Sequence, residues 1–152
     1  MKKGSILSRT GVTKANPNYF TGNVTMNEIS KIVPSKEQKI YFVTFNNGAR
    51  TKLHHHSGGQ ILITTQGKGS LVMYKKLGKD ASKFQIKKIS SINLKEGDIV
   101  YIPAKQLHTH GSIDKKLKFS HIAINTNRPS GLAAITTWYE SDFKTMVTKI
   151  LD

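Results

Sequence analysis

The sequence predicts an all-β protein built as one antiparallel barrel, and two observations support this prediction. Short β-rich runs alternate with clusters of turn residues along the middle of the chain, and no stretch of helical periodicity separates them. Short strands at even spacing are typical of an antiparallel sandwich or barrel, whereas parallel sheets need helical crossovers. The predicted strands are Ile40–Phe45, Gln60–Thr65, Ser70–Tyr74, Phe84–Ile92, Asp98–Ile102 and Phe119–Asn125.

The predicted strands are separated by glycine, asparagine and aspartate residues, which tolerate the backbone conformations of tight turns. These turns are Asn46–Gly48, Ser57–Gly59, Gly67–Gly69, Gly78–Asp80, Glu96–Asp98 and Gly111–Ser112. The lysine-rich stretch Lys75–Lys95 is long enough to form an extended, solvated hairpin. We expect a barrel core over about residues 38–126.

The two ends of the chain are expected to lie outside this core, within a single domain of residues 1–152. Residues 1–37 form an N-terminal arm, whose polar, turn-rich first 30 residues are expected over the outside of the barrel. Residues 130–152 form a C-terminal segment, in which Thr137–Leu151 is predicted to be a short helix with Ser141 or Asp142 near its start. Its apolar residues, spaced by three and four, are Trp138, Tyr139, Phe143, Met146, Val147 and Ile150.

The absence of cysteine restricts the chemistry open to this chain. With 152 residues and no cysteine, it has no disulfide scaffold, thiol catalysis, iron–sulfur cluster or cysteine-bound zinc. Any metal must therefore bind through nitrogen and oxygen.

The charge is strongly positive, with 24 Lys and Arg against 9 Asp and Glu and a formal net charge of +15. Such a charge is compatible with nucleic acid, because bound cations release counterions from phosphate. However, the only arginines are Arg9, Arg50 and Arg128, the lysines are scattered, and no helix-turn-helix, zinc-finger or RNA-recognition pattern accompanies them. We interpret the charge as a solvated basic surface and expect no nucleic-acid partner.

The chain carries no sign of membrane targeting. No apolar run approaches the ~18 residues that a spanning helix needs, and no hydrophobic signal region follows the basic start of the chain. We therefore expect no membrane partner and a cytoplasmic location.

All six histidines lie within the predicted β region, and four of them form two pairs. Side chains two residues apart on a strand share a face, so His54 and His56 project together while His55 projects to the other side. Gln60 begins the next strand, and an antiparallel partner there can bring its amide oxygen to the same point. His54, His56 and Gln60 are therefore candidate metal ligands, and His55 is expected to be a surface or barrel-wall residue.

The second pair is His108 and His110, which repeats the same spacing around Thr109. One or both could complete a metal site. His121 lies in the apolar run 119–124, where an unpartnered imidazole is costly to bury. It either lines a polar pocket or is buried for structural reasons, and the sequence leaves both interpretations open.

The spacing of these residues resembles the two sequence motifs of small single-domain cupins, which implies a jelly-roll β-barrel. The first motif is glycine, five residues, His-x-His, three residues, commonly glutamate, six residues and glycine. Its positions here are Gly48, His54, His56, Gln60 and Gly67. The second motif runs from Gly97 through Pro103 to His108, with Lys105 in place of its second glycine.

Further stretches resemble a bacterial subgroup of cupins that includes manganese-dependent hydroxynitrile lyases and carboxymuconolactone decarboxylase-like proteins. The stretches are 16–22, 47–51, 58–62, 108–111 and 120–124. In that subgroup glutamine replaces the usual glutamate, as Gln60 does here, whereas Thr109 replaces a usual aromatic residue and the hairpin at 75–92 is longer. The resemblance implies that the metal ligands are His54, His56, Gln60 and His108, and that the acid–base residues are His110 and His121.

The expected function is that of a metal-dependent enzyme. Three imidazoles and one neutral amide leave a divalent ion its full charge, so that it acts as a Lewis acid on a small oxygen-bearing substrate. We expect a lyase or decarboxylase, with manganese favoured by the resemblance and iron, nickel, zinc or cobalt as alternatives. The same site with iron could serve a dioxygenase, and a non-catalytic barrel that binds a small ligand is a third interpretation.

The substrate and the oligomeric state are expected only in outline. The expected substrate-binding residues of the pocket wall are Tyr41, Val43, Ile61, Thr109 and Asn125. Lysines near the pocket mouth, Lys52 and Lys105, could favour an anionic substrate. The resemblance and the edge strands of an all-β domain favour a homodimer.

Overall fold

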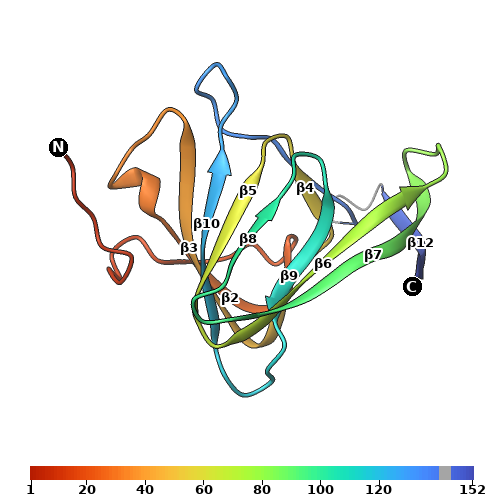
Figure 1. The fold of residues 1–152 in the computed structure, drawn as a ribbon, viewed down its shortest axis with the longest axis horizontal. Coiled ribbons are helices and arrows are strands. Elements are labelled where there is room, and N and C mark those ends of the chain that lie inside the picture. The colour runs from red at the N-terminus through yellow and green to blue at the C-terminus, as the bar shows by residue number, and fades with distance from the viewer. Residues whose placement is uncertain (141–144) are drawn as a thin grey trace.

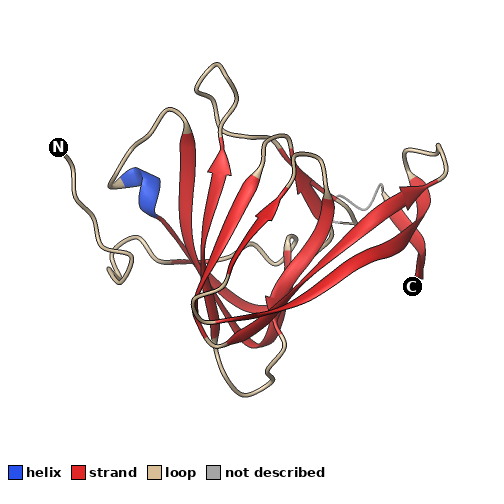
Figure 2. Cartoon of the chain, in the orientation of Figure 1, coloured by secondary structure: helices blue, strands red, loops and turns tan. Residues whose placement is uncertain are grey.

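The computed structural model describes residues 1–140 and 145–152, whose secondary structure is almost entirely β-strand (Figures 1 and 2). The strands are β1 (Thr13–Lys14), β2 (Phe20–Glu28), β3 (Gln38–Thr51), β4 (His54–His56), β5 (Gln60–Gln66), β6 (Lys68–Leu77), β7 (Lys83–Lys95), β8 (Ile99–Ile102), β9 (Leu107–Ser112), β10 (Phe119–Thr126), β11 (Thr136–Trp138) and β12 (Met146–Leu151). A single 3-10 turn, η1 (Ile29–Lys31), is the helical content of the described residues, and none of their helices could reach across a membrane. The prediction of an all-β protein is confirmed.

The strands form a jelly-roll barrel in which nearly every neighbouring pair is antiparallel. The main order is β12-β7-β6-β9-β3-β10-β5-β8, with β2 also paired to β3, and β4 paired to β9 and β11. The long strand β3 connects the two sides of the barrel, because it pairs with β2 and β10 along most of its length and with β9 at Arg50. All six predicted strands are present, as β3, β5, β6, β7, β8 and β10.

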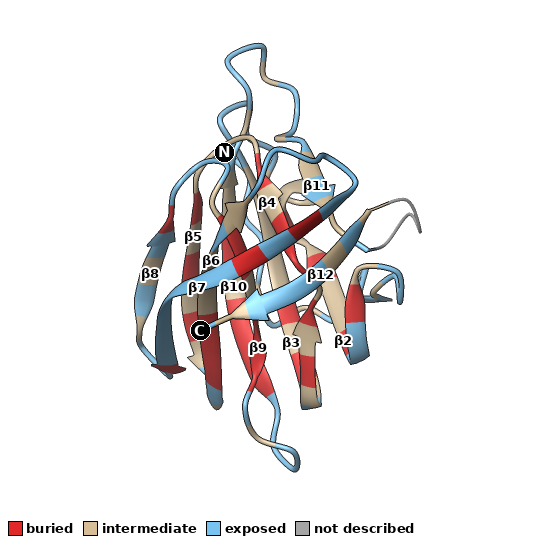
Figure 3. Ribbon diagram, turned by 90° about the vertical axis from the view of Figure 1, so that its right-hand side faces the viewer, coloured by how far each residue is buried: buried red, intermediate tan, exposed pale blue. Residues whose placement is uncertain are grey.

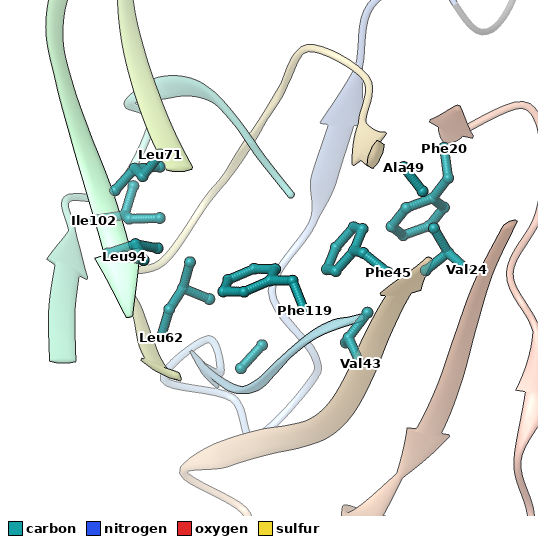
Figure 4. Close-up of a cluster of buried hydrophobic side chains, with 11 residues drawn as sticks. Phe20, Val24, Val43, Phe45, Ala49, Leu62, Leu71, Leu94, Ile102 and Phe119 are labelled. Atoms are coloured by element: carbon teal, nitrogen blue, oxygen red, sulfur yellow. The ribbon is translucent and has the colours of Figure 1, made fainter. Parts of the chain in front are cut away.

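Alternation along the strands builds the core. On β5, Gln60, Leu62 and Thr64 are buried and the residues between them are only partly so, as the two-residue period of a strand requires. Inward residues from several strands pack into one apolar cluster that includes Phe45 and Phe119, both with 0% of their surface exposed (Figure 4). The edge strands β8 and β12 are mostly exposed, whereas β3, β9 and β10 carry buried stretches (Figure 3).

The lysine-rich hairpin is formed by β6 and β7, which extend together beyond the barrel (Figure 1). Phe84 and Ile86 of β7 pack with Leu53 and Leu107 in a second apolar cluster. The predicted extended hairpin is therefore present, and this cluster attaches it to the barrel.

The predicted C-terminal helix is wrong for the described residues. Thr136–Trp138 and Met146–Leu151 are strands, while the expected helix start at Ser141 or Asp142 lies outside the described residues. Strand β12 pairs in parallel with β7. The edge of β7 offers main-chain hydrogen bonds to a segment rich in β-branched residues, and this outweighs the helical spacing of its apolar residues.

The N-terminal arm also differs from the expectation that its first 30 residues cover the outside of the barrel. Within it, β2 pairs along β3 as part of the sheet, and Val24 is buried in the core. The register of β2 shifts between Thr21 and Asn23, around a glycine with a φ of +75°. This irregularity breaks the two-residue alternation by which a strand is recognised in a sequence.

At Gly67 a turn of the barrel approaches the chain before β10 closely, and a substitution there tests this contact. Its φ is +75°, and a Cβ there would clash with the carbonyl oxygen of Lys118. We expect Gly67→Ala to destabilise the protein through left-handed strain of about 1–2 kcal/mol and, in addition, through displacement of the chain at the start of β10.

The matched control for this variant is Gly78→Ala, because Gly78 has a φ of +83° and a methyl group added there would meet no atom within 4 Å. Gly78→Ala should be destabilised by the backbone strain alone. Urea denaturation of both variants should give a free-energy loss for Gly67→Ala about twice that of Gly78→Ala or larger; equal losses would contradict the close approach.

Candidate metal centre

Four histidines from two neighbouring strands meet inside the barrel. His54 and His56 lie on β4, and His108 and His110 lie on β9, with His54 paired opposite His108. All four are buried, with at most 7% of their surface exposed. Both pairs therefore face the interior of the barrel, as their spacing predicts.

The rings are close enough to share an ion. One ring nitrogen from each of His54, His108 and His110 lies within 4.8 Å of the other two. The ring centroid of His54 is 4.1 Å from that of His108 and 5.0 Å from that of His56. This group contains His110, which the family resemblance assigns to acid–base chemistry, and does not contain His56, which the resemblance assigns to the metal.

Main-chain hydrogen bonds fix the protonation of two of these rings. The Nδ1–H of His54 donates to the carbonyl oxygen of Lys52 at 2.9 Å, and the Nδ1–H of His108 donates to that of Gln106 at 2.8 Å. A carbonyl oxygen only accepts, so each Nδ1 carries the proton. Each Nε2 therefore keeps a free lone pair for a metal.

His56 and Gln60 are held by side chains. Nδ1 of His56 lies 2.9 Å from Oγ1 of Thr136, and Nε2 of Gln60 donates to Oδ1 of Asn125 at 2.8 Å. Among the described residues, no hydrogen-bond partner is found for the remaining buried polar atoms, Nε2 of His56, Oε1 of Gln60 and Nε2 of His108. Buried polar atoms are rarely left unpaired, so these three atoms are compatible with a bound cation.

Burial keeps the imidazoles neutral. Desolvation, followed by the charges of His108 and His55, lowers the pKa of His56 to about 3. Desolvation lowers the pKa of His108 to about 4 and holds the pKa values of His54 and His110 well below their usual range. Only a neutral imidazole offers a lone pair, so these rings are ready to bind a metal at neutral pH.

The donor set is compatible with a divalent metal ion. Imidazole nitrogens and an amide oxygen suit the divalent first-row metals from manganese to zinc. Hydrogen bonds on the outer side of each ring orient the ligands, as they do in characterised metal sites.

A cavity of about 230 Å³ opens beside the histidines, and its wall is apolar, aromatic and neutral-polar. No Asp, Glu, Lys or Arg side chain is among its lining residues in the part of the chain that the structure describes. Of the predicted wall residues, Tyr41, Val43 and Asn125 line this cavity.

The placement of Ile61 and Thr109 in the pocket wall is corrected by the structure, because neither lines the cavity. Each directly neighbours inward residues on its strand, Gln60 for one and His108 for the other, and the two-residue period turns it to the outer face. Lys52 and Lys105 are also outside the cavity lining. They therefore give no support to an anionic substrate.

His121 lies next to His110, with ring centroids 4.9 Å apart in an edge-on arrangement. It has 0% exposed surface, neither ring nitrogen has a partner among the described residues, and burial lowers its pKa to about 4. Both residues line the cavity. His55 lies on the other face of β4, with its ring 5.8 Å from that of Tyr139.

Several cavity residues escape the sequence analysis. Tyr19 and Phe20 come from the segment expected to cover the barrel, Trp138 comes from the predicted helix, and Thr136 directly precedes that helix. Trp138 stacks on His54, with ring centroids 4.3 Å apart and an interplanar angle of 24°. The one available signal is that Trp138 is the single tryptophan of the chain.

The protein is thus a jelly-roll β-barrel with buried histidines beside an internal cavity, and its donor set is compatible with a divalent metal. The sequence model of the cupin family matches residues 31–149, and the chain belongs to this family. No curated protein matches the chain.

Solved structures share the fold. A cupin-like protein from Thermotoga maritima is 33% identical with a TM-score of 0.63, over 88% of this chain and 92% of that one. A cupin superfamily protein from Desulfitobacterium hafniense is 17% identical with a TM-score of 0.50, over 68% and 76%. Oxalate decarboxylase from Bacillus subtilis is 18% identical with a TM-score of 0.54, over 77% of this chain and 27% of that one. At such identities the last two are similar in fold alone.

Proposed function

We propose that the protein is a metal-dependent enzyme in which one divalent ion is held by His54, His56, Gln60 and His108. The observation that carries this proposal is the set of buried polar atoms without partners among the described residues: Nε2 of His56 and His108, and Oε1 of Gln60. In each of these side chains a hydrogen bond holds the other polar atom. Such outer hydrogen bonds orient the ligands of metal sites.

Manganese is the proposed metal because the motifs resemble the manganese-dependent cupin subgroup, which includes hydroxynitrile lyases and carboxymuconolactone decarboxylase-like proteins. Iron, nickel, zinc and cobalt are alternatives, since the same donors suit all of them. The bound ion would polarise a substrate oxygen and stabilise negative charge there, which is the chemistry of a lyase or decarboxylase.

The charge of the site favours a small anionic substrate. None of the four proposed ligands is anionic, and no Asp or Glu lines the cavity among the described residues. The protein therefore leaves the charge of the ion uncompensated, and a carboxylate or enolate oxygen of the substrate would balance it. A cavity of about 230 Å³ suits a small molecule, because drug-sized ligands occupy about 300–1,000 Å³.

We propose that His110 and His121 handle the proton of the reaction. Nδ1 of His110 and both ring nitrogens of His121 are buried without partners among the described residues, and both side chains line the cavity. A neutral imidazole within reach of a bound substrate can accept a proton from it. The edge-on contact between the two rings places a second acceptor beside the first.

A calorimetric titration of metal-free protein with Mn²⁺ tests the metal site. Wild type is expected to bind one ion per chain. His56→Ala removes a metal ligand and is expected to weaken Mn²⁺ binding by more than about 100-fold. The side chain of His55 faces away from the site, so the affinity of His55→Ala should stay within about twofold of wild type. His110→Ala is expected to keep the metal and lose turnover. Equal loss of metal in His56→Ala and His110→Ala would contradict the proposed division, and absence of binding by wild type would overturn the proposal.

Oxygen dependence separates the proposed reaction from that of an iron dioxygenase. With the Mn²⁺-loaded protein, oxaloacetate serves as the carboxylate probe, because its loss of CO₂ leaves an enolate, and mandelonitrile serves as a neutral cyanohydrin probe. We expect turnover of the carboxylate probe at the same rate in air and under anaerobic conditions, because Lewis-acid catalysis uses no O₂. If turnover stops without O₂, the lyase proposal is wrong and the protein is a dioxygenase.

We further propose that the protein forms a homodimer through the outer face of its sheet. Across β3, β10, β5 and β8, the outward residues make two apolar rows. In register, these rows are Phe42–Ile122–Ile63–Ile99 and Ile40–Ile124–Ile61–Tyr101. Neither row contains a charged residue, although the chain carries a net charge of +15, and a second copy offers the same uncharged face. Ile99 and Tyr101 are 65% and 62% exposed, and contiguous exposed apolar surface is typical of interaction sites.

The dimer is tested by light scattering after size exclusion. Wild type is expected at twice the chain mass of 16.9 kDa. Ile99 is 65% exposed on the edge strand of this face, and Ile99→Lys is expected to give a monomer. Leu117→Lys is the control, because Leu117 is 63% exposed in the β9–β10 connection and should leave the dimer intact. A monomeric wild type would refute the proposal.

A further inference from the structure

The short strand β11 lies against the strand that carries the first histidine pair. It runs antiparallel to β4 with Thr136 opposite His56, and with Trp138 opposite His54. Because alternate residues share a face, Thr136 and Trp138 lie on the side of the two inward histidines, while Thr137 is exposed. Three residues of one strand thus match the three histidines of the other one by one.

Each inward residue of β11 contacts the imidazole opposite it. The hydroxyl Oγ1 of Thr136 lies 2.9 Å from Nδ1 of His56. The indole of Trp138 stacks on the ring of His54 with centroids 4.3 Å apart. Tyr19 also stacks on Trp138, with ring centroids 4.7 Å apart and an interplanar angle of 17°.

The main chain holds β11 at both ends. Ser57 donates its N–H to the carbonyl of Ile135 at 2.8 Å, and Tyr139 donates its N–H to the carbonyl of Leu53 at 3.0 Å. These bonds join the residues that flank β11 to the residues that flank β4. The two strands are therefore fixed relative to each other, and so are the side chains that they bring together.

His56 differs from the other two histidine ligands in how its outer nitrogen is bound. His54 and His108 donate to carbonyl oxygens two residues earlier on their own chain segments. The Nδ1 partner of His56 is a side-chain hydroxyl that arrives from β11, 80 positions along the sequence. The orientation of this one ligand therefore depends on the C-terminal part of the chain.

We propose that Thr136 and Trp138 are positioning residues of the metal centre. Thr136 accepts the Nδ1–H of His56 and so keeps Nε2 unprotonated and aimed for coordination. Trp138, which stacks on both Tyr19 and His54, sets the plane of the His54 ring. Neither residue is itself a ligand. This inference rests on the proposed function, because it takes both histidines to be ligands.

The test for Thr136 compares three full-length variants with wild type. Thr136→Val removes the hydroxyl at nearly constant shape, Thr137→Val makes the same change on the exposed face, and Thr136→Ser restores a hydroxyl. Calorimetric titration with Mn²⁺ is expected to show a loss of affinity of about 10–100-fold for Thr136→Val, values near wild type for Thr137→Val, and recovery for Thr136→Ser.

A second measurement on metal-free protein distinguishes positioning from general damage to the fold. The ¹⁵N shifts of the imidazole nitrogens report which nitrogen carries the proton. In wild type, His56 is expected in the form protonated at Nδ1, and in Thr136→Val a share of it is expected to carry the proton on Nε2. His108, whose partner is a main-chain carbonyl, is expected to stay unchanged in the same spectra.

The test for Trp138 uses its own emission, because it is the single tryptophan of the chain. Paramagnetic Mn²⁺ held by a ring stacked on the indole should quench the emission in wild type. His56→Ala should abolish the quenching, and EDTA should reverse it. Trp138→Leu should weaken Mn²⁺ binding in calorimetry, while Trp138→Phe, which keeps a ring over His54, should recover most of the affinity.

The outcomes separate the inference from the proposed function. If wild type binds no Mn²⁺, the proposed function fails, while the imidazole shifts still test the role of Thr136. If wild type binds Mn²⁺ but Thr136→Val binds it equally well with an unchanged His56 tautomer, the positioning role of Thr136 is refuted and the metal site stands. Unchanged Mn²⁺ affinity in Trp138→Leu refutes the role of Trp138.

Discussion

The centre depends on the hydrogen bond at the outer nitrogen of the three proposed histidine ligands, His54, His56 and His108. A neutral imidazole has one donor and one acceptor, and burying the ring leaves both needing partners. In His54 and His108 the Nδ1–H donates to a main-chain carbonyl oxygen, and in His56 the Nδ1 lies beside the hydroxyl of Thr136. The acceptor nitrogens of His54 and His108 then lie on the inner side, and that of His56 does so when Thr136 accepts its Nδ1–H, as we propose. The geometry of the proposed ligands is therefore set by the backbone of the strands and by one residue of the C-terminal segment.

The fold supplies this geometry through the position of β4. The strand has only three residues, and its neighbours are β9 on one side and β11 on the other. Strand β9 adds His108 and His110, while β11 adds the side chains that hold the first pair. The alternation of side chains along each strand directs all of these groups to the same interior point. Insertion of one residue in any of the three strands would reverse the faces and dismantle the centre.

Burial of so many unpaired acceptors destabilises the barrel. Each buried acceptor without a partner costs about 1–3 kcal/mol, and the centre contains several. The apolar cluster around Phe45 and Phe119 offsets this cost, and both side chains also contact the histidines, since Phe45 lies 5.4 Å and Phe119 lies 5.7 Å from the ring of His121. A metal that satisfied the acceptors would stabilise the folded state, because it would bind there and not to the unfolded chain.

The sequence by itself determined the all-β class, the six central strands, the inward direction of both histidine pairs and the restriction to nitrogen and oxygen donors. These follow from local rules: the two-residue period of a strand, the turn preference of glycine, and the lack of cysteine. The same period also shows why Ile61 and Thr109 face outward, since each directly neighbours an inward residue. Only the tertiary structure decided that Thr136–Trp138 and Met146–Leu151 are β-strands, that β2 joins the sheet, and that Trp138 and Thr136 reach the histidines. Those features depend on pairing with strands far away in the chain, and a segment with spacing suited to a helix becomes a strand when a sheet edge offers it hydrogen bonds.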